Sequence, residues 1–410
     1  MESIKVNRHR LRETFDQISA IGATKRGGVH RLALSDADWE ARDLLKTWCD
    51  ESGYTLRVDR MGSMFARRAG TDAGLAPVVI GSHLDSQPMA GRFDGPAGVL
   101  TALEVLRTLD DHDVATRHPI DLVNWTNEEG ARFSPPLMAS GVYAGIKELD
   151  FALGCTDVSG VSVSTELKRI GYAGAEPVGG PVAAYIELHI EQGTVLQDAG
   201  ATIGAVSGVV GIRDTMVEIV GEDTHAGPLP MERRRDALVA AAEMILAARK
   251  IGLAHKPDAR VTIGRLSVPS NSHSVVPGRV EMTLDIRHPE QAAIDLLQVE
   301  LEANFRLIAG RSDVEVTFRP LWNYKAVAFD EALRSAIADA SQTLGYKQLS
   351  LPSRAGHDAW NMARIAPSAM IFIPCRDGIS HNEAEFASDE DIAAGADVLL
   401  AATRFADAKY

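Results

Sequence analysis

The first half of the chain alternates between short apolar runs and longer stretches with helical periodicity. Residues 35–53 begin with Ser35, a favourable N-cap, carry apolar side chains at helical spacing and end on a glycine, so a helix is predicted there. Residues 76–83 and 118–126 are apolar runs typical of buried strands, and 95–109 between them predicts an apolar helix. This strand–helix–strand order predicts a mostly parallel sheet covered by helices.

The pattern changes after residue 193. Three strands and two helices are predicted in this part, the strands at about 213–221, 260–268 and 277–287 and the helices at about 232–252 and 289–309. Such a set favours a separate α+β sandwich. From about residue 328 the helix–strand alternation returns, and it closes with a capped helix at 388–408.

These patterns predict an α/β protein of two domains. The larger domain, residues 1–209 and 326–410, holds the mostly parallel sheet, and a smaller α+β domain at 210–325 interrupts it. In parallel sheets, ligands bind beyond the carboxyl ends of the strands. The larger domain is therefore the expected place for a site.

Composition and charge narrow the class of protein. Of 410 residues, 45% are hydrophobic and 24% are charged, as in folded globular proteins. The net charge of −14 argues against nucleic acid as a ligand, because phosphate binding needs a basic face. The densest basic cluster, residues 232–236, stands beside acids where the helical pattern begins and is interpreted as a solvated helix end.

Cysteine usage and apolar segments indicate the compartment. Cys49, Cys155 and Cys375 are far apart and form no CxxC pair, so neither a disulfide framework nor a thiolate metal site is expected. The N-terminus lacks the apolar core of a signal peptide, and the apolar block at 237–248 is too short to span a bilayer. A cytoplasmic protein without membrane contact is predicted.

Several candidate metal ligands follow predicted strands or stand in the loops beside them. They occur in GSHLDSQPMAGRFDG, TNEEG, IELHIEQG and GISHNEAE, and they are His83, Asp85, Asp94, Glu128, Glu129, His189 and His381. Each alone is explained better by a structural role, for example a core histidine or a solvated glutamate. Together, imidazoles and carboxylates at the element ends of one domain can hold two metal ions, with one carboxylate bridging and one left as a base.

The chain resembles a known family through an ordered series of motifs. GSHLDSQPMAGRFDG, NWTNEEGARF, ELHIEQG, GEDTHAG, PMERRRDAL, LDIRHP, AGHDA and SHNEAE are similar to the metal-dependent amidohydrolases that cleave N-carbamoyl amino acids. This hydantoinase/carbamoylase group includes β-ureidopropionase and allantoate amidohydrolase and belongs to the M20 metallopeptidase clan. The resemblance runs from about residue 8 to the final helix.

The resemblance implies two divalent ions per subunit, zinc first, with manganese, cobalt or nickel as alternatives. It assigns one ion to His83, Asp94 and His189, and the other to Asp94, Glu129 and His381, with Asp94 bridging. Glu128 would be the general base that takes a proton from the attacking water. Asp85 would accept from the free ring nitrogen of His83 and orient it, although a loop cap explains Asp85 equally well.

The resemblance also implies substrate contacts. His225 would be the oxyanion donor and would reach into the partner subunit's site, so a homodimer is expected; without the motif, His225 would be interpreted as a turn cap. Arg287 would bind the substrate carboxylate, and Gln192 would also contact substrate. Where relatives carry an asparagine, this chain has Ser274, for which Asn271 or His273 could compensate. His357 and Asp358 are expected near the site, but not as ligands.

The implied reaction is hydrolysis of an N-carbamoyl amino acid, of the L-α or β-alanine type, to the free amino acid, carbon dioxide and ammonia. An allantoate- or ureidoglycolate-type substrate, or an N-acyl amino acid, remains an alternative on the same metal centre. The smaller domain would serve as lid and dimerisation surface. A non-catalytic dimeric binding protein is disfavoured because every ligand and Glu128 are present, and neither a P-loop nor a dinucleotide-binding pattern occurs.

Overall fold

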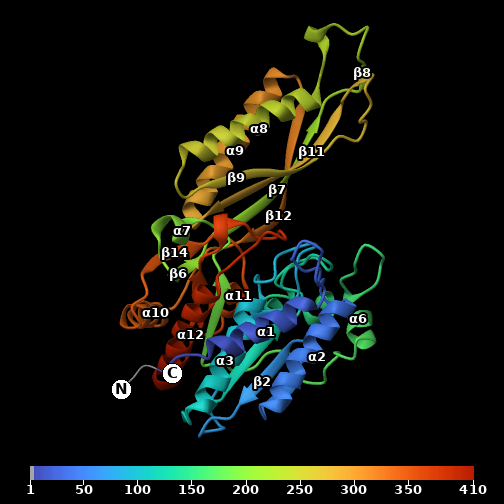
Figure 1. The fold of residues 1–410 in the computed structure, drawn as a ribbon. Helices are drawn as coiled ribbons and strands as arrows, with labels where there is room; N and C mark the ends of the chain where they lie inside the picture. The colour runs from blue at the N-terminus through green and yellow to red at the C-terminus, as the bar shows by residue number, and fades with distance from the viewer. Residues whose placement is uncertain (1–3) are drawn as a thin grey trace. The chain divides into compact units, whose positions relative to one another are not determined.

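The computed structural model describes residues 4–410 and divides the chain into two compact units (Figure 1). The larger unit runs to Gly208 and resumes from Ala328 to Tyr410, and the inserted unit is Val209–Val327. Among residues 4–410, no helix is both long and apolar enough to cross a membrane. The roles predicted for the two domains stay predictions at this point.

The larger unit is built on a nine-stranded sheet in the order β1-β2-β4-β3-β5-β15-β6-β13, with β14 paired to β6. The four central strands β4, β3, β5 and β15 are parallel, and antiparallel pairs flank them. The prediction of a mostly parallel sheet is thus confirmed for its centre. The strands are β1 (Thr55–Val58), β2 (Met64–Arg68), β3 (Val78–His83), β4 (Ile120–Trp125), β5 (Ala184–Ile190), β6 (Ile203–Val209), β13 (Val327–Ala328), β14 (Gln348–Ser353) and β15 (Ser368–Ile373).

Helices cover this sheet because its central strands are apolar on both faces. Every residue of β3, β4, β5 and β15 is buried, and α3 and α12 pack against them. The helices of the larger unit are α1 (Arg8–Ala20), α2 (Asp36–Glu51), α3 (Pro96–Asp111), α4 (Met138–Tyr143), α5 (Leu149–Gly154), α6 (Val163–Arg169), α7 (Val195–Ala199), α10 (Glu331–Thr343), α11 (Asp358–Met362) and α12 (Asp389–Lys409), with a 3-10 turn at Arg376–Gly378.

The inserted unit is a four-stranded antiparallel sheet in the order β12-β7-β11-β9, and two long helices pack against it. Its core gathers apolar residues of both helices and of the inner strands, such as Met244, Phe305 and Met282. Its elements are β7 (Gly211–Val220), β8 (Thr224–His225), α8 (Ala237–Ala254), β9 (Arg260–Ser267), β10 (Val275–Val276), β11 (Arg279–His288), α9 (Gln291–Arg311) and β12 (Glu315–Tyr324).

The start of α8 corrects a predicted boundary. The helix was expected from about residue 232, but Met231–Arg233 forms only a 3-10 turn and α8 begins at Ala237. Asp236 is the reason, since its side chain accepts from the backbone N–H groups of Leu238 and Val239 and caps the helix there. The arginines at 233–235 therefore precede the helix.

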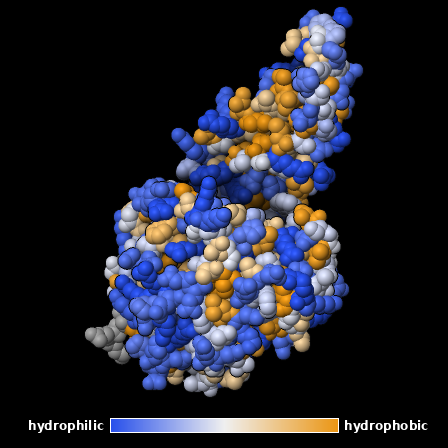
Figure 2. Space-filling view, turned by 45° about the vertical axis from the view of Figure 1, so that its right-hand side comes forward, coloured by the Kyte–Doolittle hydropathy of each residue, from blue (hydrophilic) through white to orange (hydrophobic). Residues whose placement is uncertain are grey.

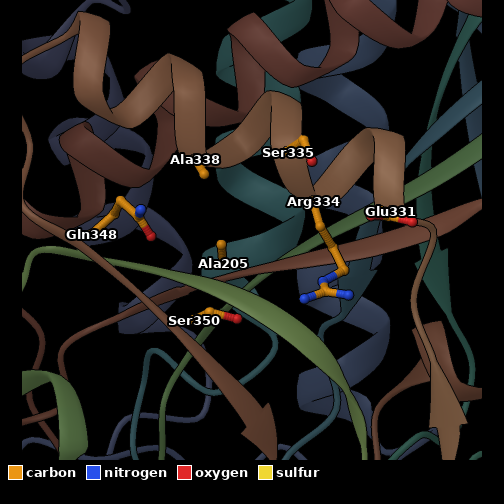
Figure 3. Close-up of a pocket in the computed structure, with 7 residues that line it drawn as sticks. All are labelled: Ala205, Glu331, Arg334, Ser335, Ala338, Gln348 and Ser350. Atoms are coloured by element: carbon orange, nitrogen blue, oxygen red, sulfur yellow. The ribbon is translucent and has the colours of Figure 1, made fainter.

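A cavity of about 200 Å³ lies on the larger unit between α10, β6 and β14 (Figure 3). Arg334 and Glu331 of α10 line it together with Ser350 and Gln348 of β14. None of the residues predicted for the site lines this cavity.

Candidate metal centre

The candidate ligands collect at the carboxyl ends of the central strands because the strands run in register. His83 ends β3 directly beside Trp125, the last residue of β4, and the loop with Glu128 and Glu129 follows. His189 lies near the end of β5, paired with Phe372 of β15. Asp94 comes just before α3. Four segments far apart in sequence thus meet at one edge of the sheet, as parallel strands require.

Gly95 permits the close approach of the segment that carries Asp94 to the ring of His83. It has φ +81°, and a Cβ there would lie 2.4–2.7 Å from three atoms of the His83 ring. A larger residue would push the ring aside or move Asp94, its chain neighbour. The FDG sequence therefore has a steric reason for its glycine.

The first cluster consists of His83, Asp94 and His189, all buried, with donor atoms within 4.8 Å of one another. Nε2 of His83 lies 3.6 Å and Nε2 of His189 lies 3.1 Å from Oδ1 of Asp94. The Nδ1 atoms are 2.9 Å from the main-chain oxygens of Asp85 and Ile190, respectively. These contacts place the protons on Nδ1 and leave both Nε2 atoms as metal-type donors.

The second cluster consists of Asp94, Glu129 and His381. Nε2 of His381 lies 3.4 Å from Oδ2 of Asp94 and 3.4 Å from Oε2 of Glu129. The side chain of His381 is 49% exposed, so this cluster is open to solvent on one side. Asp94 thus contributes one oxygen to each cluster, which is the arrangement of a bridging carboxylate.

The donor set fits two divalent cations. Ligand atoms about 2.0–2.2 Å from one ion are themselves about 3 Å apart, close to the separations seen in both clusters. Nε2 of His189 is buried and has no hydrogen-bond partner of good geometry among the described residues. Imidazole and carboxylate ligands suit zinc and also manganese, cobalt or nickel.

The electrostatics of the centre also favour cations. Burial, with the nearby charge of Asp94, raises the pKa of Glu129 to about 8. Burial lowers the pKa of His83 to about 4, whereas at His189 the attraction of Asp94 outweighs burial and raises the pKa to about 9. Crowded carboxylates resist ionisation, and a divalent cation between them would offset their mutual repulsion.

Glu128 lies beside the first cluster but belongs to neither. Its Oε2 is 3.5 Å from Nε2 of His83, and the residue is 7% exposed. Burial, then the charges of Asp358 and Glu129, raise the pKa of Glu128 well above its usual value. A carboxyl group in this position can accept a proton and hold it near neutral pH.

Asp85 does not contact His83 in the predicted way. Its Oδ1 is 3.7 Å from Nδ1 of His83, and the ring nitrogen contacts the main-chain oxygen of Asp85 instead. The carboxylate accepts from the backbone N–H groups of Glu128 at 3.2 Å and Glu129 at 3.3 Å. Asp85 therefore links the segment of His83 to the loop with the two glutamates. Burial raises its pKa to about 7.

Three non-glycine residues at the centre adopt left-handed backbone conformations. Asn127, Gln192 and His381 have φ values of 57°, 57° and 54°. Such residues are uncommon outside glycine, and they gather at functional sites where the surroundings impose the conformation. At Asn127, the side-chain amide donates to the carbonyl oxygen of Phe133 at 2.7 Å and fixes the turn.

Gln192 contacts the carboxylate of Asp94, which the two clusters share. Its Nε2 donates to Oδ2 of Asp94 at 2.6 Å, and its Oε1 is buried without a partner among the described residues. The predicted role of Gln192 as a substrate contact remains a prediction. The contact with Asp94 makes Gln192 a neighbour of both clusters.

Comparison with known proteins decides the family. The sequence pattern of Peptidase family M20/M25/M40 matches residues 79–404. The chain belongs to this family. It is 43% identical over 400 residues to an N-carbamoyl-L-amino-acid amidohydrolase of Rhizobium meliloti, covering 97% of this chain and 96% of the relative.

Two further proteins are similar to this M20 chain over nearly its full length. The crystal structure of an amidase of the hydantoinase/carbamoylase family from Burkholderia multivorans is 48% identical, with a TM-score of 0.93 and 99% of each chain covered. An allantoate amidohydrolase of Bacillus subtilis is 31% identical over 402 residues, covering 96% of this chain and 97% of the relative. The protein is a hydrolase that acts on amide bonds.

Sequence reasoning missed residues that support the M20 centre. Glu385 accepts from the backbone N–H groups of Phe93 and Asp94, each at 3.0 Å. Ser380 donates to Oδ2 of Asp94 at 2.9 Å and to Glu385 at 2.8 Å. Both residues stand close to His381 in the stretch GISHNEAE, so position next to a predicted ligand was the available signal.

His357 and Asp358 lie near the centre, as expected. The ring of His357 is 4.4 Å from that of His189, centroid to centroid. Asp358 is fully buried, and its charge is the first of the neighbouring charges that raise the pKa of Glu128. Neither residue belongs to the two metal-type clusters.

The remaining predicted residues lie in the inserted unit, in two separate places. His225 of β8 and Ser274, which precedes β10, lie at a small two-stranded sheet formed by β8 and β10, and Asn271 lies in the segment before β10; all three are exposed. Arg287 lies near the far end of β11, where Nε and Nη2 donate to the carboxylate of Asp285 at 3.0–3.2 Å. Nδ1 of His225 accepts from the backbone N–H of Gly227 at 3.0 Å, which leaves Nε2 for another partner.

Proposed function

We propose that the protein hydrolyses the carbamoyl C–N bond of N-carbamoyl amino acids with the help of two divalent metal ions. One water is consumed, and R–NH–CO–NH2 gives the free amino acid, carbon dioxide and ammonia. The observation that carries the proposal is the pair of clusters that share Asp94, with Glu128 beside them. The 43% identical relative from Rhizobium meliloti carries the name of this reaction.

In this proposal His83, Asp94 and His189 hold one ion, and Asp94, Glu129 and His381 hold the other. Zinc is the first expectation, with manganese, cobalt or nickel as alternatives. When bound, the ions polarise the ureido carbonyl and lower the pKa of the attacking water. Asp85, Gln192 and Ser380 keep the ligands in place through their hydrogen bonds to His83 and Asp94.

Glu128 is the proposed general base. Its carboxylate takes the proton of the attacking water and passes it to the leaving nitrogen, so that one group serves two steps. Burial and the neighbouring carboxylates raise the pKa of Glu128, which favours its holding the proton between the two steps. Glu128 keeps its position because its backbone N–H is bound to Asp85.

Arg287 is the proposed partner of the substrate carboxylate. Its planar fork suits bidentate carboxylate binding, and Asp285 already orients one edge of the guanidinium. Gln192 is proposed to contact the substrate as well. Asn271 and Ser274 are proposed as further contacts, and a serine hydroxyl in place of an amide would alter which substrates fit.

His225 is the proposed oxyanion donor, acting on the partner subunit's substrate. Within the inserted unit, β11 runs from Arg279, which pairs with Val220 shortly before β8 and His225 in the chain, to Arg287, which pairs with Ile212. Eight strand residues span about 26 Å. A small ureido substrate cannot bridge that distance. If Arg287 binds the substrate of one site, His225 must serve another, which supports its action in trans.

An apolar surface on the inserted unit supports a homodimer. Val239, Leu246 and Leu253 of α8 are seven residues apart and exposed, so they form one stripe along the helix. Leu296, Val299 and Leu307 of α9 are also exposed. Figure 2 shows hydrophobic side chains gathered on the surface of this unit. A second copy that buries them is proposed, with the inserted unit as dimerisation surface and lid.

A second candidate uses the same centre on a different substrate. The allantoate amidohydrolase of Bacillus subtilis matches nearly the full chain at 31% identity, so an allantoate- or ureidoglycolate-type ureido acid is the alternative. An N-acyl amino acid is the remaining possibility within the same chemistry.

Three free cysteines support the proposed cytoplasmic location, where thiols stay reduced.

Ammonia release from a substrate panel, with and without chelator, tests the proposal. The panel holds N-carbamoyl-β-alanine, N-carbamoyl-L- and D-α-amino acids, allantoate, and an N-acetyl amino acid scored by free amine. We expect chelator-sensitive turnover of an N-carbamoyl-L-amino acid or of N-carbamoyl-β-alanine. Turnover of allantoate or of the acetyl compound alone would replace the proposed substrate, and chelator-resistant turnover would overturn the metal centre.

A further inference from the structure

Four charged side chains are buried together behind the metal-type clusters. They are Arg31, Asp38, Arg42 and Asp85, each at most 1% exposed, and we call them the four-charge cluster. Buried charges are costly unless they are paired and hydrogen-bonded. Two arginines face two aspartates, and their hydrogen bonds lead to the two segments of chain that carry His83, Glu128 and Glu129.

Arg42 of α2 binds the start of the loop that carries the two glutamates. Its Nε donates to Oδ2 of Asp38 at 2.9 Å, and its Nη1 donates to the carbonyl oxygen of Gly62 at 2.7 Å. Its Nη2 donates to Oγ1 of Thr126 at 3.2 Å. Thr126 directly follows β4 and stands two residues before Glu128. Each nitrogen of the guanidinium thus has a separate partner.

Arg31 binds the segment that carries His83. Its Nη1 donates to the carbonyl oxygen of Leu84 at 3.2 Å, and its Nη2 donates to that of Ile18 at 2.6 Å. The backbone of Arg31 also pairs with Ser86, whose N–H donates to the oxygen of Arg31 at 2.8 Å. Leu84 lies between His83 and Asp85 in the sequence. Arg31 therefore fixes the chain on both sides of Asp85.

Asp85 joins the segment that Arg31 binds to the loop that carries Glu128 and Glu129. Its carboxylate accepts from the backbone N–H groups of Glu128 and Glu129, and the charges of both arginines act on the cluster's aspartates. The path from Arg42 to the proposed base therefore has two branches, the hydrogen bond to Thr126 and the electrostatic attraction of Arg42 for the buried carboxylate of Asp85. Neither branch includes a metal ligand's side chain.

We propose that Arg42 is a positioning residue, which sets the geometry of Glu128 and Glu129 through Thr126 and the four-charge cluster. The proposal rests on the function proposed for Glu128 and Glu129. The rigid fork of arginine is needed because three partners in different directions share one guanidinium, and a lysine ammonium offers a point charge without that geometry.

Three variants of the full-length, metal-reconstituted protein test this role. Arg42→Met removes the charge and the donors, Arg42→Lys keeps only the charge, and Arg10→Met is the matched control. Arg10 binds Glu104, whose side chain is 1% exposed, with Nη2 and Nε each 2.8 Å from a carboxylate oxygen, so the control also strips a buried carboxylate of its arginine. Thermal stability, kcat, KM and zinc retention during dialysis against a weak chelator are measured for each.

We expect both methionine variants to lose stability, but only Arg42→Met to lose catalysis. Its kcat should fall about 10–100-fold with little change in KM, and zinc retention should fall as well, as is typical when a residue that orients ligands is removed. Arg42→Lys should recover only part of the loss. Equal kcat and zinc retention in Arg42→Met and Arg10→Met would overturn the proposal.

If Arg42→Met does not fold, Thr126→Val gives a second test, because it removes only the hydroxyl that accepts from Arg42. A severalfold fall in kcat with normal stability is expected, and an unchanged kcat would contradict the branch through Thr126. Zinc retention distinguishes failure of the proposed function from failure of the positioning role of Arg42. If the wild type hydrolyses no compound of the panel, the proposed function fails, while loss of zinc from Arg42→Met alone would still support the positioning role.

Discussion

The candidate functional groups of the two units differ in their exposure to solvent and in the contacts that hold their side chains. In the larger unit, the side chains of His83, Asp94 and His189 are at most 3% exposed, and backbone groups hold both histidine rings in one orientation. In the inserted unit, His225 is exposed, and its ring accepts from the backbone N–H of Gly227, only two residues away. The first arrangement is complete within one unit, whereas His225 is proposed to act with a partner subunit.

This difference separates groups that are held in place within one unit from groups that are proposed to close over a bound substrate. Groups that take part in the reaction must be fixed to within a fraction of an ångström, which burial and backbone hydrogen bonds achieve. Groups that close over a substrate must first let it enter, so exposure is compatible with their role. The comparison predicts severe losses from changes in the larger unit and losses that depend on the substrate or the partner from changes in the inserted unit.

The largest effect is expected from Glu128→Gln. Removing the base should lower kcat about 10²–10⁴-fold while metal content stays near normal, because Glu128 is in neither cluster. Rates and metal content are measured together. Glu166→Gln is the control, since Glu166 is a buried carboxylate that binds Arg169 and belongs to neither cluster. Near-normal turnover of Glu128→Gln would rule out the assignment of the base.

His225→Ala should lower kcat about 10²–10³-fold, the usual loss for one oxyanion donor. Mixing this variant with Glu128→Gln, after subunit exchange, should restore part of the activity, because one site of each mixed dimer would have both residues. His255→Ala, which changes an exposed histidine of the same unit, should leave kcat unchanged. Absence of restored activity in mixed dimers would contradict action in trans.

Arg287→Ala should lower kcat/KM about 10–100-fold for substrates that carry a carboxylate, because a bidentate charged contact is lost. The same substrates with the carboxylate converted to an amide should be affected much less. Arg279→Ala, at the other end of β11, is the control, since its guanidinium binds Glu218 and Glu281 on the surface. An equal loss on acid and amide would argue against the role of Arg287.

The smallest effect concerns stability and pH in the larger unit. Burial raises the pKa of Asp59 from 3.8 to about 7 in the folded state. The folded state therefore binds the proton more tightly, so this contribution to stability is full below about pH 4 and is lost as the pH rises through 7. The contribution of Asp59 to the free energy of unfolding is on the order of a few kcal/mol. Unfolding midpoints at about pH 5 and pH 8 measure it.

Asp59→Asn should flatten that dependence, whereas Asp72→Asn, which changes an exposed turn, should keep it. An unchanged slope in Asp59→Asn would mean that other groups carry the pH dependence.

The order of elements in the sheet's centre could be predicted because the buried parallel strands are short and mostly apolar runs, as at 78–83 and 120–125. The short strands β1 and β2 on one side of the sheet and the strand β12 could not be predicted, because they are short or carry charged and polar residues that interrupt the apolar pattern. The boundary of α8 was wrong because three arginines in a row fit a helical pattern that Asp236 then overrides.

The candidate ligands could be named from sequence because each stands beside a strand end or a glycine turn. The contacts that hold them could not. Whether the carboxylate or the carbonyl of Asp85 faces the ring of His83 depends on a local backbone path that no residue pattern encodes. Glu385 and Arg42 act from 291 and 84 residues away in sequence, on Asp94 and Thr126, so only the folded chain reveals them.

The most direct test of the account is the number of metal ions bound per chain. Metal analysis of the reconstituted wild type, His381→Ala and Asp94→Ala by mass spectrometry would give this number. We expect two ions in the wild type, one in His381→Ala and a loss of both in Asp94→Ala, since only Asp94 belongs to both clusters. A wild type with a single ion, or an Asp94→Ala variant that keeps two, would contradict the shared carboxylate on which the proposed function depends.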